Sequence, residues 1–199
     1  MALIIYEPVE VGAEAFVKFW AVRYGGYDET FYQDNIGKEL NTERILEWYR
    51  WKNGMRLAPL KRKSVMANFV NRRAELDELS PELEARAFLA RFNSGGVIWR
   101  IFWLHCWQPT RFPIYDQHVH RAMQFIQTGA KEEIPTRDSE KISSYIDQYL
   151  PFYCRFNGIN HREVDKALWA YGKFLSENDF PTDPNSPLVL KTHEGPGSK

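Results

Sequence analysis

Apolar residues recur at helical spacing along several stretches of the chain. One such pattern lies near the C-terminus, at Val164, Ala167, Leu168, Tyr171, Phe174 and Leu175. Another follows Asp116, at Val119, Ala122, Met123 and Ile126. Spacing of i, i+3, i+4 and i+7 places such side chains on one face of a helix. Strand-like alternation is confined to residues 3–6, so we predict an all-α fold.

Capping residues and glycines indicate where the predicted helices begin and end. An early helix lies between Gly12 and Gly25. Another begins at the Asn41-Thr42 cap and ends at Asn53-Gly54, because asparagine is a common first cap and glycine a common stop. Two more are predicted at residues 61–76 and from Ser80-Pro81 to about residue 92. A further helix begins near Ser139 and is interrupted near Pro151 or Asn157-Gly158.

Chain length and composition indicate a single domain with a large core. The chain has 199 residues, of which 44% are hydrophobic and 15% aromatic, so it has ample material for a packed interior. We predict one helical domain at residues 1–180, best supported at 80–173. From Phe180 onward the composition turns to Pro, Ser, Gly and Lys. We therefore expect residues 181–199 to form a flexible C-terminal tail.

Several function classes are disfavoured by what the sequence lacks. No apolar run approaches the roughly 18 residues of a membrane span, and no basic segment precedes the short apolar N-terminus. We therefore expect a cytoplasmic protein without membrane contact, nucleoid-associated if it binds DNA. The two cysteines, Cys106 and Cys154, are too few for an iron–sulfur cluster or a cysteine-only zinc site. We expect both to be buried thiols, and we expect no cofactor.

The charge is unevenly distributed, although the formal net charge is +0. Residues 44–73 contain one acid, Glu47, and the basic residues Arg44, Arg50, Lys52, Arg56, Lys61, Arg62, Lys63, Arg72 and Arg73. Acids follow directly, at Glu75, Asp77, Glu78, Glu82 and Glu84. This basic segment is interpreted either as an ordinary solvated helix face or as a surface that faces nucleic-acid phosphates.

A glycine turn and an aspartate bracket the most apolar stretch of the chain. The sequence reads FNSGG, then VIWRIFWLHCW, and Asp116 follows a proline-containing loop. The free N–H groups of a glycine turn before a helix can bind phosphate, although plain helical hairpins often have the same turn. Asp116 is interpreted either as a simple helix cap or as a carboxylate that the helix start keeps ionised for chemistry.

These segments together resemble the helix-hairpin-helix DNA glycosylase superfamily over residues 80–173. FNSGG stands in place of the hairpin, with Gly96 at its second glycine, and the run Asp116–Arg121, DQHVHR, stands in place of a DTHVxR motif. The segment VDKALWAYGK at residues 164–173 is similar to the closing helix of the oxoguanine branch. The resemblance implies a helical fold with two lobes and a cleft. It also implies an N-glycosylase whose essential carboxylate is Asp116.

The departures from the family pattern bear on mechanism. Ile98 occupies the place of the nucleophilic lysine of bifunctional members, and no lysine lies between Leu79 and Lys131. The resemblance therefore implies monofunctional base excision without a Schiff-base intermediate. Ser94 and Asn93 replace the first glycine and the proline of the hairpin. The predicted DNA-binding residues are Asn93, Ser94, Gly95, Gly96, Gln117, Lys52, Arg56, Lys61, Arg62 and Lys63.

Alternatives remain open at this point. The scaffold is also compatible with a non-catalytic or defence-associated nucleic-acid-binding protein, or with a relative that acts on modified bases, nucleosides or RNA. His118 and His120 are two positions apart on a helix, point in different directions and predict no metal site. The expected partner is double-stranded DNA, bound by a monomer or weak dimer. Which aromatic residues line a base pocket does not follow from the sequence.

Overall fold

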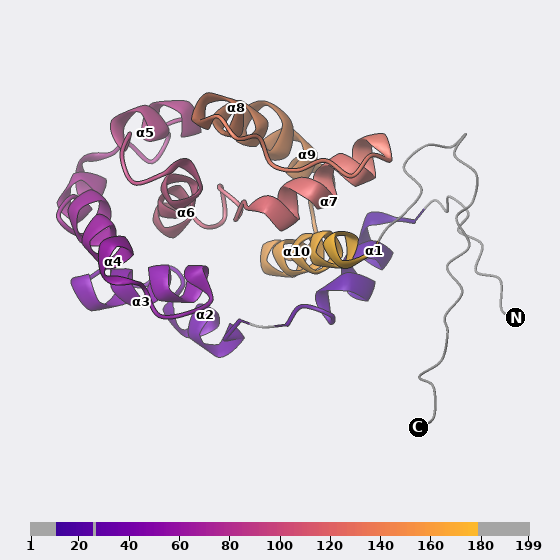
Figure 1. Cartoon of the computed structure of the whole chain (residues 1–199), viewed down its shortest axis with the longest axis horizontal. Coiled ribbons are helices and arrows are strands. Elements are labelled where there is room, and N and C mark those ends of the chain that lie inside the picture. The colour runs from indigo at the N-terminus through magenta and orange to yellow at the C-terminus, as the bar shows by residue number, and fades with distance from the viewer. Residues whose placement is uncertain (1–10, 26, 179–199) are drawn as a thin grey trace, which may run out of the picture.

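The computed structural model describes residues 11–25 and 27–178, and every regular element in these ranges is helical (Figure 1). The all-α prediction is confirmed for this part of the chain. The possible strand at residues 3–6 and the predicted tail at 181–199 lie outside the described residues.

The first half of the chain, as far as the structure describes it, forms four α-helices, one π-helix and one 3-10 helix. The α-helices are α1 (Ala13–Ala21), α2 (Glu29–Asn35), α3 (Thr42–Asn53) and α4 (Pro59–Val65). A π-helix at Met66–Val70 continues α4, and a 3-10 helix follows at Arg73–Glu78.

The second half consists of a helical hairpin, α5 and α6, and the helices that follow it. Its α-helices are α5 (Ala85–Arg91), α6 (Val97–Trp107), α7 (Gln117–Thr128), α8 (Asp138–Ser143), α9 (Leu150–Tyr153) and α10 (His161–Glu177). A π-helix at Ser144–Tyr149 joins α8 to α9, and a short 3-10 turn at Cys154–Phe156 follows α9. The predicted interruption therefore falls at Asn157-Gly158. Pro151 does not end the helix, because it lies in the first turn of α9, where the lack of a backbone N–H is tolerated.

Helix α3 shows why local capping signals were reliable. The Asn41 side chain accepts a hydrogen bond from the Arg44 N–H at 2.8 Å, and Gly54 takes the left-handed conformation with φ 70°. A side-chain oxygen at the first position satisfies a free amide, and glycine ends the helix without steric strain.

Two predicted helices had wrong boundaries, and one helix was not predicted. The continuous helix at 61–76 is replaced by α4, the π-helix and a break at Asn71-Arg72 before the 3-10 helix. The helix predicted from Ser80-Pro81 begins only at Ala85, because Ser80 opens a turn in which its carbonyl accepts the Leu83 N–H at 2.9 Å. Helix α2 was not predicted, although Asp28 caps it by accepting the Phe31 N–H.

The buried helix α6 is the centre of the aromatic core. Most of its residues are buried, including Phe102 and Trp103, as its nearly continuous apolar sequence predicts. Tyr49 of α3 stacks on Phe69 at a centroid distance of 4.6 Å and lies against Phe102 at 5.6 Å. Burial of each such side chain contributes about 2–3 kcal/mol. This packing holds α3 against α6.

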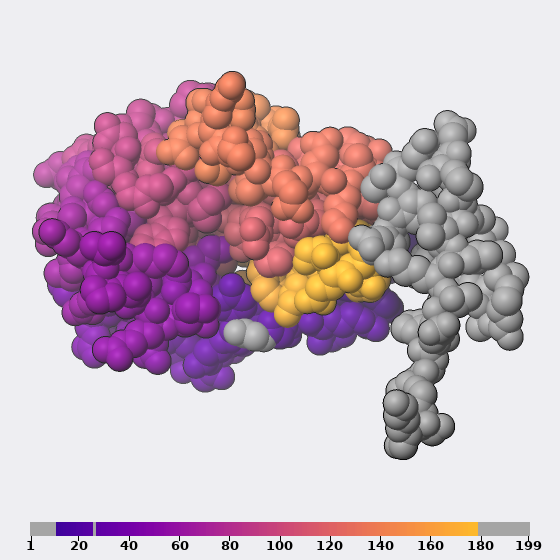
Figure 2. Space-filling view, in the orientation of Figure 1, coloured from indigo at the N-terminus to yellow at the C-terminus, as the bar shows by residue number. Residues whose placement is uncertain are grey.

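Helices α7 and α10 approach each other so closely that a glycine is required. A Cβ added at Gly172 would lie 1.8 Å from the carbonyl oxygen of His118. Beside this contact, Arg121 donates to the Gly172 carbonyl at 3.1 Å and forms an ion pair with Glu133. Helix α10 also packs on α1, and Figure 2 shows α10 between α7 and the first helices of the chain. The start of α7 therefore lies directly beside α10.

Candidate active-site pocket

Asp116 caps α7 and is held by three hydrogen bonds. Its Oδ1 accepts the N–H groups of His118 at 2.9 Å and Val119 at 3.1 Å. Its Oδ2 accepts a hydrogen bond from the Lys52 Nζ at 2.8 Å, across 64 positions of sequence. The Asp116 side chain is 14% exposed and the Lys52 side chain is 7% exposed. Asp116 therefore caps α7 through Oδ1, while Oδ2 binds a buried ammonium from α3, so its contacts go beyond those of a simple cap.

These contacts keep the Asp116 carboxylate charged. Burial raises the pKa of this group, but the Lys52 charge, the Lys52 hydrogen bond and the Val119 N–H outweigh burial and hold its pKa below the ordinary value. Asp116 is therefore an anion at neutral pH with little contact with water. Such a group stabilises a nearby positive charge more strongly than a solvated carboxylate does.

Asp116 lies on the wall of a narrow pocket. The pocket has about 290 Å³ of empty space including its open mouth, and its enclosed part has room for about one water molecule. Its walls combine aromatic and charged side chains, namely Tyr24, Tyr27, Trp51, Lys52, Ile114, Asp116, Val119, Arg162, Asp165 and Trp169.

Three aromatic rings form one side of this pocket. Tyr24 and Tyr27 stack at a centroid distance of 5.8 Å, and both meet Trp169 edge-on, at 5.1 and 5.3 Å. Tyr24 and Tyr27 come from the segment between α1 and α2, whereas Trp169 comes from α10. Aromatic walls of this kind suit a flat ring that stacks between them.

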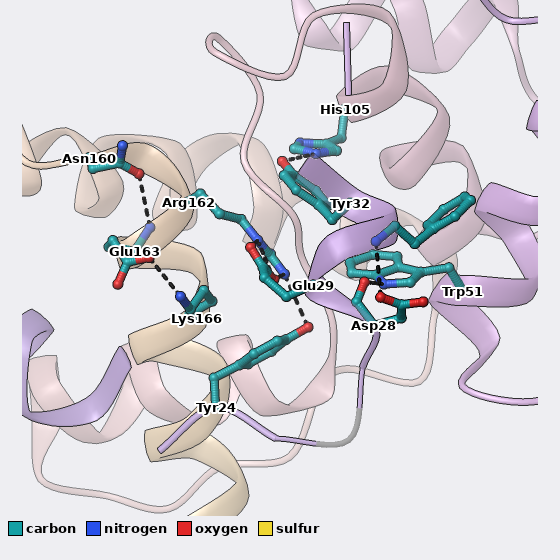
Figure 3. Close-up of polar contacts among 11 residues, drawn as sticks. Tyr24, Asp28, Glu29, Tyr32, Trp51, His105, Asn160, Arg162, Glu163 and Lys166 are labelled. Atoms are coloured by element: carbon teal, nitrogen blue, oxygen red, sulfur yellow. Dashed lines mark hydrogen bonds and ion pairs between the residues drawn. The ribbon is translucent and has the colours of Figure 1, made fainter. Parts of the chain in front are cut away.

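Arg162 of α10 forms another wall, and Figure 3 shows how it is held. Its guanidinium forms an ion pair with Glu29 at 2.7 Å and donates to the Tyr24 hydroxyl at 3.2 Å. It also lies 4.0 Å from the centroid of the Tyr32 ring. These contacts connect α2 to α10 beside the pocket and restrain Arg162 in one position.

Asp165 lines the same pocket and is 4% exposed. Its Oδ1 has no hydrogen-bond partner among the described residues, and the same is true of the Trp169 Nε1 one helical turn later. Burial raises the pKa of Asp165 to about 7, although Arg162, Lys52 and the Ile114 N–H favour its charged form. The pKa values of Asp165 and Asp116 are thus shifted in opposite directions, although both groups lie in one pocket.

The predicted DNA-binding cations separate into buried and exposed groups. Lys52 is buried in the ion pair with Asp116, whereas Arg56, Lys61, Arg62 and Lys63 are exposed. Within residues 11–25 and 27–178 none of these four forms an ion pair, and Lys61 donates to Asn53 Oδ1 at 2.7 Å. The other basic residues of this segment mostly pair with acids: Arg50 with Glu47, Arg72 with Glu75 and Arg73 with Asp77. The exposed four lie on the segment after α3 and on α4 itself.

The predicted hairpin is present between α5 and α6. Gly95 and Gly96 have φ values of 99° and 82°, which favour glycine. Gly95 also has no room for a side chain, since an added Cβ would lie 2.8 Å from the Phe69 ring. Asn93, Ser94 and Gly96 are exposed, as is Gln117 at the first position of α7. In the described part of the chain, the N–H groups of residues 94–96 donate no hydrogen bond.

The histidines near Asp116 are held in structural contacts, as predicted. His120 is buried, and its Nδ1 lies 2.8 Å from the Tyr115 hydroxyl. His118 faces Trp169 and lies 3.3 Å from Arg121. No cluster of potential metal ligands occurs in the part of the chain that the structure describes. Cys106 is buried as expected, but Cys154 is exposed, so the prediction for the second thiol was wrong.

Sequence reasoning missed most of the pocket wall. No sequence motif marked Arg162, Tyr24 or Tyr27. Lys52 was predicted to lie on an exposed DNA-binding surface. Asp165 carried no signal either, because it points about 100° around the helix from Val164, away from the predicted apolar face.

Comparison of the chain with family models, curated proteins and solved structures returned no match. No helix among the described residues is long and apolar enough to cross a membrane.

Proposed function

We propose that this protein is a DNA N-glycosylase of the helix-hairpin-helix type that removes a base and leaves an abasic site. Asp116 is the essential carboxylate of this proposal. The single observation that carries it is a buried, ionised Asp116 on the wall of an aromatic pocket whose enclosed part has room for about one water molecule.

The chemistry of base excision requires a group of this kind. When an N-glycosidic bond breaks, positive charge develops on the sugar, and a fixed anion beside it lowers the barrier. The carboxylate can then orient the attacking water and accept its proton. Removal of one preorganised group of this type typically costs about 3–4 kcal/mol of transition-state stabilisation.

The pocket walls support the extrusion of a base into the protein. Tyr24, Tyr27 and Trp169 offer ring faces and edges against which a flipped base packs. The pocket is too narrow for a base in this conformation, so binding requires it to widen.

The surface beside the pocket supports DNA backbone binding. Arg56, Lys61, Arg62 and Lys63 are exposed cations without acidic partners in the described residues, so they are available to phosphates. The free N–H groups of the α5–α6 turn are a second phosphate contact. We expect Gln117 to contact the nucleotide next to Asp116.

Lys52 favours a second candidate, a glycosylase with lyase activity. Its amine lies 2.8 Å from Asp116, although Ile98 occupies the lysine position of the family pattern. An ammonium in an ion pair has no free electron pair, so our main proposal gives Lys52 the role of positioning Asp116. In the lyase role, the Lys52 amine would attack the sugar carbon and form an imine with the sugar.

The test measures base release from duplexes that carry damaged and normal bases. We expect Asp116→Asn to lower release by at least a hundredfold. As a matched control, Asp147→Asn changes an exposed aspartate whose ion-pair partner among the described residues is Arg86, and it should leave release unchanged. Borohydride treatment during the reaction should trap no covalent complex; a complex lost in Lys52→Gln would support the lyase. Salt-sensitive DNA binding without release from any duplex would favour a non-catalytic binding protein instead.

A further inference from the structure

Asp165 is a second carboxyl group in the pocket with no role so far. It is 4% exposed, lines the pocket together with Asp116, and its Oδ1 has no partner among the described residues. A buried polar atom without a partner is costly in a folded protein, so it requires an explanation such as a catalytic role. The unpartnered Trp169 Nε1 is four positions further along α10, on the same helix face and in the same pocket wall.

We propose that Asp165 is the general acid of this pocket and gives its proton to the departing base, so that the substrate is a base that is uncharged before excision. This inference rests on the proposed glycosylase function.

The protonation states of the two aspartates suit such a division of roles. Burial raises the pKa of Asp165 to about 7, whereas the pKa of Asp116 is lowered. Two titratable groups whose environments drive their pKa values apart are typical of an acid and a base that act together. The groups that act on Asp165 come from every neighbouring element, namely Tyr32 of α2, Lys52 of α3, Asp116 before α7, Tyr145 and Tyr149 of the π-helix, Tyr153 of α9 and Arg162 of α10.

The proposed step balances in atoms and charge. The Asp165 proton moves to an acceptor nitrogen or oxygen of the base, and the electron pair of the glycosidic bond leaves with the base. Water then bonds to the sugar carbon, and Asp116 accepts the proton that the water loses. Exchange with solvent afterwards returns a proton to Asp165 and removes one from Asp116. The products are the free base and an abasic site.

This role defines a class of substrate. An uncharged base leaves as an anion unless it gains a proton, whereas a purine methylated at N7 is already cationic and leaves neutral. General acid catalysis contributes typically 10²–10⁴-fold when it is required. It therefore accelerates excision of uncharged bases and contributes little to excision of cationic ones.

The test compares two duplexes that differ at one nucleotide. One carries the uncharged base that the wild-type protein releases best among adenine, hypoxanthine and 8-oxoguanine, and the other carries 7-methylguanine. We expect Asp165→Asn to slow release of the uncharged base about 100-fold. The factor by which it slows release of 7-methylguanine should be at least tenfold smaller. Asparagine has the shape of the protonated aspartic acid, so we expect the variant to fold. Glu163→Gln, an exposed carboxylate on the same helix, is the matched control.

Each outcome decides the matter. Equal losses on both duplexes, or no loss on the uncharged base, would overturn the acid role while leaving the glycosylase proposal intact. Absence of release by the wild type from any duplex would remove the glycosylase proposal and this inference with it. A carbon-13 NMR titration adds a readout that is independent of turnover: one carboxyl group should titrate near neutral pH and disappear in Asp165→Asn. Titration of Asp165 below about pH 5 would refute the proposal.

Discussion

Replacement of Lys52 by methionine should destabilise the fold, because it leaves the Asp116 carboxylate buried without its cation. The Nζ and Oδ2 atoms are 2.8 Å apart, and the side chains are 7% and 14% exposed. At an effective dielectric constant of 20, charges at this distance attract each other by about 6 kcal/mol, of which desolvation offsets a part. Truncation of one partner of a buried pair typically costs about 3–5 kcal/mol. Two backbone N–H groups still bind Asp116, so we expect about 3 kcal/mol.

The assay is urea unfolding at neutral pH, followed by tryptophan fluorescence, of Lys52→Met, Asp116→Asn and the double variant. Because the two groups contact each other, we expect a coupling energy of about 2 kcal/mol. Lys63→Met is the matched control, since Lys63 is exposed and forms no ion pair in the described residues, and it should change stability by less than about 0.5 kcal/mol.

The pH dependence checks the same contact. The folded-state pKa of Asp116 is lowered, so its contribution to stability is present above its unfolded pKa of about 4 and is lost as pH falls through the folded pKa. Lys52→Met should raise the folded-state pKa of Asp116. The loss of stability of this variant relative to the wild type should therefore decrease below about pH 4. Additive single substitutions, or a deficit independent of pH, would refute the ion pair as a determinant of this site.

Three further predictions follow from other contacts. Asp165 has a raised folded pKa of about 7, so its ionisation costs stability as pH rises from about 4 to 7; Asp165→Asn should be more stable than wild type at pH 8, by about 2–4 kcal/mol, and equal to it near pH 4, as measured by urea unfolding. Gly172→Ala would place a methyl group against the His118 carbonyl and should cost about 3 kcal/mol or more in thermal unfolding. Joint replacement of Arg62 and Lys63 by glutamine should reduce the salt dependence of duplex binding by about two phosphate contacts while the melting temperature stays unchanged.

Local features of the sequence determined the helical class and several helix ends. The Asn41 cap, the Gly54 stop and the buried character of α6 depend on residues within a few positions of each other, so periodicity and capping rules reach them. The position of Asp116 at a helix start is local in the same sense. The boundaries that failed lie at residues 66–72 and 80–84. In the second segment, Gln108 and Arg111 donate to the backbone carbonyls of residues 81–83, which a continuous helix would use itself.

The pocket itself is decided by tertiary structure. Lys52 lies in a stretch of cations and aromatics that indicated a nucleic-acid surface, and only the packing of α3 against α6 turns it inward to Asp116. Asp165 similarly becomes a buried acid only because α2, α7 and α9 converge on α10. The sequence alone determined which groups are charged and where helices start. Tertiary contacts decide which charged groups are removed from water and which partners they face. Some of these contacts join residues more than 100 positions apart, as for Glu29 and Arg162.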